Sequence, residues 1–214
     1  VRDEWKPLWG KRAVVEDHFN ELVIDLVNPA GQPERMQLVV RGYNDGFAFC
    51  YKIPDGEGPR VNVQSELTAY NFAGDYTAWF YNGENHNIGP EKLTETDGTR
   101  LPVMTVKAGD KHYMAIHEAC LETGAPLVLQ SKGGESLFSV ASKPTSLSPG
   151  YTSAWRVVLY GTTPGVLTDS HLLELLNPDP DSRYDFSWVK PGLAVWDWRI
   201  NGAVWDGFTY GMSY

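Results

Sequence analysis

His112 to Leu121 reads HYMAIHEACL, an apolar stretch with turn-forming residues on both sides. A short apolar run between turns is typical of a buried β-strand. Because side chains alternate between the two faces of a strand, Ile116, Glu118 and Cys120 are predicted to share one face with Met114. That face is the one we expect to be turned inward, so the carboxylate of Glu118 is the residue that needs an explanation.

Two interpretations of Glu118 follow from the sequence. Burying an unpaired carboxylate costs several kcal/mol or more, so buried acids are paired, metal-bound or protonated. In the structural interpretation, Glu118 pairs with an Arg across the sheet, or its strand lies on an edge where both faces are wet. In the functional interpretation, Glu118 reaches out of a β scaffold into a site.

The rest of the chain predicts an all-β protein. Strand-like runs recur about every ten residues with turns between them, which is typical of an antiparallel sandwich or barrel. Asn44-Asp45-Gly46 lies between two such runs and is a strong hairpin signal, because these residues tolerate the backbone of tight turns. The predicted strands are Phe19–Val27, Met36–Tyr43, Phe47–Ile53, Arg60–Gln64, Glu66–Phe72, Thr77–Tyr81, Leu101–Val106, His112–Leu121, Pro126–Gln130, Leu137–Ala141 and Ala154–Gly161.

One short helix is predicted over Asp169–Leu176, which reads DSHLLELL. Thr168 or Asp169 can cap its start, and Asn177-Pro178 ends it. The tail from Ser187 to Tyr214 holds four of the eight tryptophans without a clear period. So much apolar surface needs something to pack on, and we expect the chain to be cut short at both ends.

The bulk composition narrows the possible partners. The 214 residues carry a formal net charge of -9, which argues against nucleic acid or an anionic membrane surface. No run approaches the roughly 18 apolar residues of a membrane span. Aromatic residues make up 13% of the chain, which suits both β-sheet packing and sugar binding. Cys50 and Cys120 fit no zinc spacing and are expected to act as small buried hydrophobes.

Several motifs for catalysis or metal binding fail on spacing. His117-Glu118 is not the start of a zinc-binding HExxH motif, because Leu121 occupies the position of the second histidine. Asp169, Ser170 and His171 are adjacent in sequence, which fits helix capping better than a catalytic triad. Nothing in the chain supplies two facing carboxylates for glycoside hydrolysis.

An ordered set of blocks nevertheless resembles a known family. The set is WKPLWG (Trp5–Gly10), Asn20-Glu21-Leu22, RGYNDGFAFCY (Arg41–Tyr51), YMAIHEACL (Tyr113–Leu121), AWRVVLYG (Ala154–Gly161), HLLELLNP (His171–Pro178) and WVKPGLAVWDW (Trp188–Trp198). It is similar to the N-terminal domain of glycoside hydrolase family 97, whose members include α-glucosidases and α-galactosidases. The resemblance runs from Trp5 to Trp198, nearly the whole chain.

The resemblance implies an architecture. The family's N-terminal domain is an antiparallel β-supersandwich, related to the galactose-mutarotase scaffold, that packs on a catalytic (β/α)8 barrel. Residues 1–186 would then be that domain without its first strands, and residues 187–214 would be the linker that leads into the barrel. No catalytic residue is expected in this chain, because the family's acid and its base or nucleophile lie on the barrel. Family membership also implies a periplasmic or secreted location.

The resemblance further implies a metal ligand and a substrate. Glu118 in AIHEA matches the family's ITEA-like motif, whose Glu is a calcium ligand in the active site; Ca²⁺ takes six to eight such oxygen ligands. Trp196 and Trp198 match the Trp-Asp-Trp that leads into the barrel, where an aromatic side chain lines the sugar pocket. Arg199 replaces a further Trp there, and Cys50 replaces the more usual Arg of an AFRY-like strand.

The resemblance thus implies one domain of a calcium-dependent, exo-acting α-glycosidase that acts on α-linked oligosaccharides. The alternative is a non-catalytic carbohydrate-binding or structural module with the same sandwich, because a fold alone does not define a function. The reading frame beyond Tyr214 separates the two: an alternating βα pattern with acidic residues at strand ends would define the enzyme.

Overall fold

The computed structural model describes residues 2–27, 30 and 33–193. Antiparallel strands dominate it, so the predicted all-β fold class is confirmed. The first strands are β1 (Arg2–Trp5), β2 (Val15–His18), β3 (Asn20–Val27), β4 (Pro33–Tyr43), β5 (Gly46–Lys52), β6 (Val61–Val63), β7 (Ala69–Asn71) and β8 (Thr77–Tyr81). The later ones are β9 (Ile88–Lys92), β10 (Asp97–Ala108), β11 (His112–Ala119), β12 (Leu129–Lys132), β13 (Leu137–Val140), β14 (Thr145–Leu147) and β15 (Trp155–Gly161).

The strands form one large sheet and two small ones. The large sheet has 11 strands, in the order β3-β4-β5-β15-β11-β10-β12-β13-β7; off this order, β8 pairs with β10, and β9 pairs with β8. The two small sheets are β1-β2 and β14-β6. Strand β11 lies in the middle of the large sheet, antiparallel to β10 on one side and to β15 on the other.

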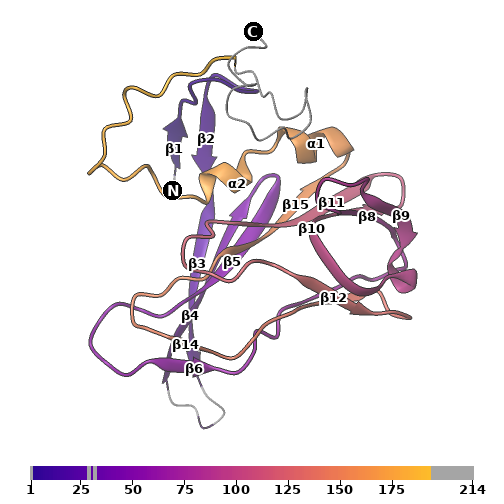
Figure 1. Ribbon diagram of the computed structural model, residues 1–214, viewed down its shortest axis with the longest axis horizontal. Coiled ribbons are helices and arrows are strands. Elements are labelled where there is room, and N and C mark those ends of the chain that lie inside the picture. The colour runs from indigo at the N-terminus through magenta and orange to yellow at the C-terminus, as the bar shows by residue number, and fades with distance from the viewer. Residues whose placement is uncertain (1, 28–29, 31–32, 194–214) are drawn as a thin grey trace, which may run out of the picture.

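Strand β10 connects two parts of the large sheet. Its second half pairs with β11 from Met104 to Ala108, whereas its first half pairs with β12 from Asp97 to Arg100. The register against β8 shifts between Leu101 and Met104, where one half passes into the other. The β12 end therefore lies apart from the β3–β5 end, and helices α1 and α2 stand above the sheet on one side (Figure 1).

Both faces of β11 are buried, each in a different hydrophobic core. Ala115 and Ala119 face a core shared by β4, β5 and β15, which Leu172 and Leu176 of the helical segment cover. Ile116 faces a second core built from β8, β10, β12 and β13. Small alanines on one face let the helices approach closely, while the larger Ile116 fills the space between the two parts of the sheet. The face of Ile116 was predicted to point inward, and it does, but the face of Ala115 and Ala119 is buried as well.

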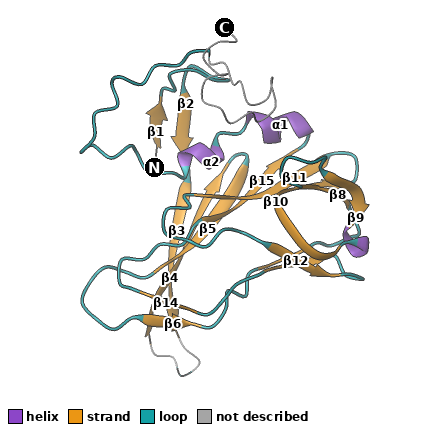
Figure 2. Ribbon diagram, in the orientation of Figure 1, coloured by secondary structure: helices purple, strands orange, loops and turns teal. Residues whose placement is uncertain are grey.

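The helix predicted over Asp169–Leu176 is shortened to α2 (Leu172–Leu175), and a short helix that was not predicted, α1 (Pro164–Asp169), precedes it (Figure 2). Asp169 therefore ends a helix instead of capping one, and neither helix has a side-chain cap at its start. Ser170 separates the two helices with an extended backbone, and Lys11 donates hydrogen bonds to the carbonyl groups of Thr168, in α1, and of Ser170 itself. In the described part of the chain, no helix has the length and apolar character needed to cross a membrane.

Two of the differences between the predicted and the observed strands concern residues near Glu118. The strand predicted over Glu66–Phe72 is reduced to β7, which leaves Glu66 in a loop. The strand predicted over Pro126–Gln130 begins only at Leu129, which leaves Leu127 in the loop after β11. In each loop, a backbone N–H group that would have bonded to a neighbouring strand donates to a side chain instead: Glu66 to Ser142, and Leu127 to Glu118.

The hairpin predicted at Asn44-Asp45-Gly46 is confirmed. Strands β4 and β5 pair from Gln37 and Lys52 down to Tyr43 and Gly46, so Asn44 and Asp45 form a two-residue turn. Gly46 has a φ of 156°, and a Cβ there would lie 2.3 Å from the carbonyl oxygen of Val158. Only glycine fits where the hairpin approaches β15 so closely.

Gly124 offers a test of the packing behind Glu118. A Cβ at Gly124 would lie 2.2 Å from the backbone nitrogen of Ala154, just before β15. We expect Gly124→Ala to lower the free energy of unfolding by about 1–3 kcal/mol, because overpacking forces the two backbones apart. Thermal unfolding measures this, with Gly42→Ala as control, since a Cβ at Gly42 meets nothing within 4 Å. Equal melting temperatures for the two variants would contradict the close approach.

Candidate functional site

Glu118 lies near the end of β11, directly opposite Arg156 of β15 in the strand register. Only 8% of its side chain is exposed, and Oε2 lies 3.6 Å from Nη1 of Arg156. The Arg partner expected in the structural interpretation of Glu118 is therefore present.

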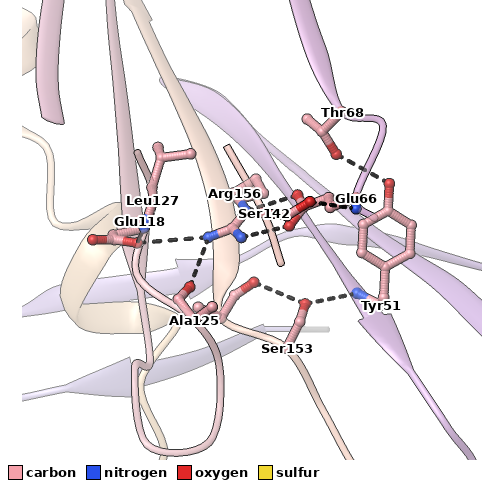
Figure 3. A network of polar contacts seen from close by, with 10 residues as sticks. Tyr51, Glu66, Thr68, Glu118, Ala125, Leu127, Ser142, Ser153 and Arg156 are labelled. Atoms are coloured by element: carbon pink, nitrogen blue, oxygen red, sulfur yellow. Dashed lines mark hydrogen bonds and ion pairs between the residues drawn. The ribbon is translucent and has the colours of Figure 1, made fainter. Parts of the chain in front are cut away.

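The contacts of Glu118 involve one of its two carboxylate oxygens. Oε2 faces Arg156 and accepts a short hydrogen bond from the backbone N–H of Leu127. The other oxygen points away from these partners (Figure 3). One oxygen is thus fixed by the domain, and the second makes no hydrogen bond or ion pair with the residues that the structure describes.

Arg156 is bound mainly to a second carboxylate, that of Glu66. Its Nε donates to Oε1 at 3.0 Å and its Nη2 donates to Oε2 at 2.7 Å, a bidentate pair. Burial by itself lowers the pKa of Arg156, but the hydrogen bonds and charge of Glu66 outweigh it and raise that pKa. Arg156 is therefore a fixed cation. Its Nη1 lies 3.4 Å from the carbonyl oxygen of Ala125 and 3.6 Å from Oε2 of Glu118.

The three charged side chains form a buried cluster with a net charge of −1, the sum of Glu66 (−1), Arg156 (+1) and Glu118 (−1). Their side chains are 17%, 3% and 8% exposed, respectively. Within the described residues, no second cationic side chain lies within ion-pairing distance of Glu118. One of the two negative charges is therefore not balanced by a cationic side chain of the described residues.

His117 points to the opposite face of β11. Its Nδ1 accepts a hydrogen bond of 2.7 Å from the backbone N–H of Glu118, which places the ring proton on Nε2. Burial lowers the pKa of His117, although the charge of Glu118 acts in the other direction. The neutral ring is therefore part of the scaffold that holds the backbone at Glu118.

Cys120 does not share the face of Glu118, contrary to the sequence prediction. The strand ends at Ala119, and Cys120 adopts a positive φ of 54° that turns the chain. Its N–H donates to Oδ1 of Asn177, which ties the end of β11 to the segment after α2. Cys120 consequently packs beside the core under the helices, while Cys50 is fully buried in it.

The other predicted site residues, Trp196 and Trp198, lie outside the described residues. The predicted division into residues 1–186 and 187–214 remains a prediction for the same reason. No group of three His, Cys, Asp or Glu side chains suited to a metal ion occurs in the described part of the chain. Glu118 is thus one candidate ligand and not a complete site.

Together, the fold and this cluster define a β-sandwich domain that fixes one carboxylate beside a buried ion pair. The sequence profile described as "Glycosyl-hydrolase 97 N-terminal" matches residues 1–178. The chain belongs to this family, as its sequence blocks indicated.

Two curated relatives are similar to this chain in sequence. The chain is 27% identical over 225 residues to a "Retaining alpha-galactosidase" of Bacteroides thetaiotaomicron, an alignment that covers 86% of this chain and 33% of the relative. It is 29% identical over 188 residues to a "Probable retaining alpha-galactosidase" of Streptomyces bingchenggensis, covering 78% of this chain and 27% of the relative. The chain therefore spans a third or less of the length of these relatives.

Solved structures share the fold. A glycoside hydrolase family 97 enzyme from Pseudoalteromonas sp. strain K8, in complex with acarbose, has a TM-score of 0.75 at 25% identity. The match covers 90% of this chain and 31% of that enzyme. A β-arabinopyranosidase has a TM-score of 0.63 at 18% identity, which shows a shared fold alone.

Proposed function

We propose that this chain is the N-terminal domain of an exo-acting α-glycosidase that removes terminal α-linked sugars, with α-galactosides as the first candidate substrates. Membership of the glycosyl-hydrolase 97 N-terminal family over residues 1–178 is the observation that carries the proposal. The two curated relatives named as α-galactosidases support the choice of sugar. The catalytic residues belong to a barrel domain on which this domain packs, as the family resemblance implies.

Within that enzyme, Glu118 is proposed to be one ligand of a calcium ion. The residues fit such an ion in two respects: the free oxygen of Glu118 is a hard donor, and the cluster around it carries a net negative charge. Calcium needs six to eight oxygen ligands, so the remaining ones come from the barrel and from water. When bound, the ion would supply positive charge at the active site. Trp196 and Trp198 are proposed separately to form part of the sugar pocket.

Hydrolysis by the full-length protein tests this function. We expect release of 4-nitrophenol from its α-galactoside, loss of most of that activity in a calcium chelator, and recovery when calcium is added back. The α-glucoside serves as the matched substrate, because it differs from the α-galactoside only in the configuration of one hydroxyl group. Faster hydrolysis of the glucoside would reassign the sugar. No hydrolysis of either substrate, by a folded full-length protein supplied with calcium, would refute the glycosidase assignment and favour a binding module.

A further inference from the structure

We infer that Glu66 and Arg156 position Glu118: Glu66 holds the Arg156 guanidinium in a bidentate pair and so keeps one oxygen of Glu118 free for a cation. This inference rests on the proposed calcium role of Glu118 and adds two residues to it. Glu66, Arg156 and Glu118 come from a loop before β7, from β15 and from β11, and they converge at one place (Figure 3).

The division of the Arg156 donors is the central observation. A guanidinium can bind a carboxylate through two parallel N–H donors, and in this protein both Nε and Nη2 are directed at Glu66. The nitrogen that faces Glu118 is Nη1, at 3.6 Å, a distance beyond a good hydrogen bond. Arg156 therefore contributes its charge to Glu118 from one side without enclosing the carboxylate.

The loop that carries Glu66 is itself fixed. The backbone N–H of Glu66 donates to Oγ of Ser142 at 2.8 Å. Two residues further along, the Thr68 hydroxyl is 3.1 Å from the hydroxyl of Tyr51, a residue of β5. Glu66 is thus held in place by the scaffold, so its grip on Arg156 does not depend on the cation.

Without the charge of Glu66, the balance of the cluster changes. Among the described residues, Glu118 then becomes the one carboxylate within reach of Arg156, and a bidentate pair between them would engage both oxygens of Glu118. The net charge of the cluster would rise from −1 to 0, which removes its preference for a cation. Glu66 consequently prevents Arg156 from competing with the metal ion.

Calcium titration of the full-length protein tests this role. After chelation, the calcium-induced rise in melting temperature and the calorimetric dissociation constant are measured for each variant. We expect Glu66→Gln to weaken calcium binding by about 10–100-fold, the usual cost of losing a group that supports a metal ligand. Glu91→Gln is the matched control, because it removes the same charge from another Arg–Glu pair, Glu91 and Arg100 at 3.1 Å, and should leave calcium affinity unchanged.

A double variant distinguishes this role from simple loss of packing. In Glu66→Gln/Arg156→Met the competing cation is gone and the cluster again carries a net charge of −1, so calcium affinity should return to within about threefold of the parent's. A merely structural role predicts the opposite, since the double variant has lost more interactions than the single one.

The outcomes separate this inference from the calcium proposal. If Glu118→Gln abolishes the calcium response while Glu66→Gln binds calcium like the parent, the positioning role is wrong and Glu118 remains a ligand. If the double variant binds no better than Glu66→Gln, Arg156 is not a competitor and the inference also fails. If the parent itself shows no calcium response, both the ligand role and the positioning role are wrong.

Discussion

Replacing Glu118 with Gln in the full-length protein is expected to lower turnover roughly 100-fold, the upper end of what disturbing a metal's supporting groups costs. The substitution keeps the shape of the side chain but removes the negative charge that the proposed calcium ion needs. Raising the calcium concentration should therefore restore part of the lost activity. Turnover measured over a range of calcium concentrations, in parent and variant, tests this expectation.

The structure also predicts that Glu118→Gln costs little stability. Arg156 keeps its bidentate pair with Glu66, so the variant leaves a neutral ion pair in the interior and no uncompensated charge. The metal-free variant should melt close to the metal-free parent. A variant that melts early, yet responds to calcium as the parent does, would show that Glu118 is a structural residue only.

Removing Arg156 is expected to have the largest effect on stability. Arg156→Met leaves two carboxylates, Glu66 and Glu118, buried without their common cation. Breaking a buried pair in this way costs about 3–5 kcal/mol, which corresponds to a fall in melting temperature of roughly 10 °C for a domain of this size. Scanning calorimetry of the metal-free full-length protein measures the change.

Arg183 provides the control for that experiment. It also pairs with a carboxylate, that of Asp181, but 80% of its side chain is exposed. Arg183→Met should leave the melting temperature unchanged, because exposed ion pairs contribute little. An Arg156→Met variant that melts together with the Arg183→Met variant would mean that the buried cluster is not what holds these strands together.

The sequence predicted the strands better than their ends. Hairpin β4–β5 follows from local turn chemistry at Asn44-Asp45-Gly46, so neighbouring residues suffice to place it. The helix predicted over Asp169–Leu176 is interrupted at Ser170, where Lys11 binds the carbonyl groups of Thr168 and Ser170. Lys11 is more than 150 positions away in sequence, so no local periodicity could have indicated that interruption.

The sequence identified the central residue of the candidate site but not the partners of that residue. A carboxylate on an apolar strand marked Glu118, because an unpaired buried charge is costly wherever the strand lies. Its partners could not be identified, because Arg156 is opposite Glu118 only through the pairing of β11 with β15. The role of Glu66 was harder still to predict, because the sequence pattern placed Glu66 in a strand and the structure places it in a loop. A search for an Arg in a strand-like run, within AWRVVLYG, would have found the partner that the structural interpretation required.

The burial of β11 on both faces has a consequence for assembly. A side chain on a mobile loop must lose conformational entropy when it is recruited to a ligand, and that loss weakens binding. Glu118 extends from a strand that is paired on both edges and packed into a core on each face, so this loss occurs when the domain folds. A cation or a neighbouring domain that binds Glu118 therefore meets a carboxylate that has already lost its conformational entropy.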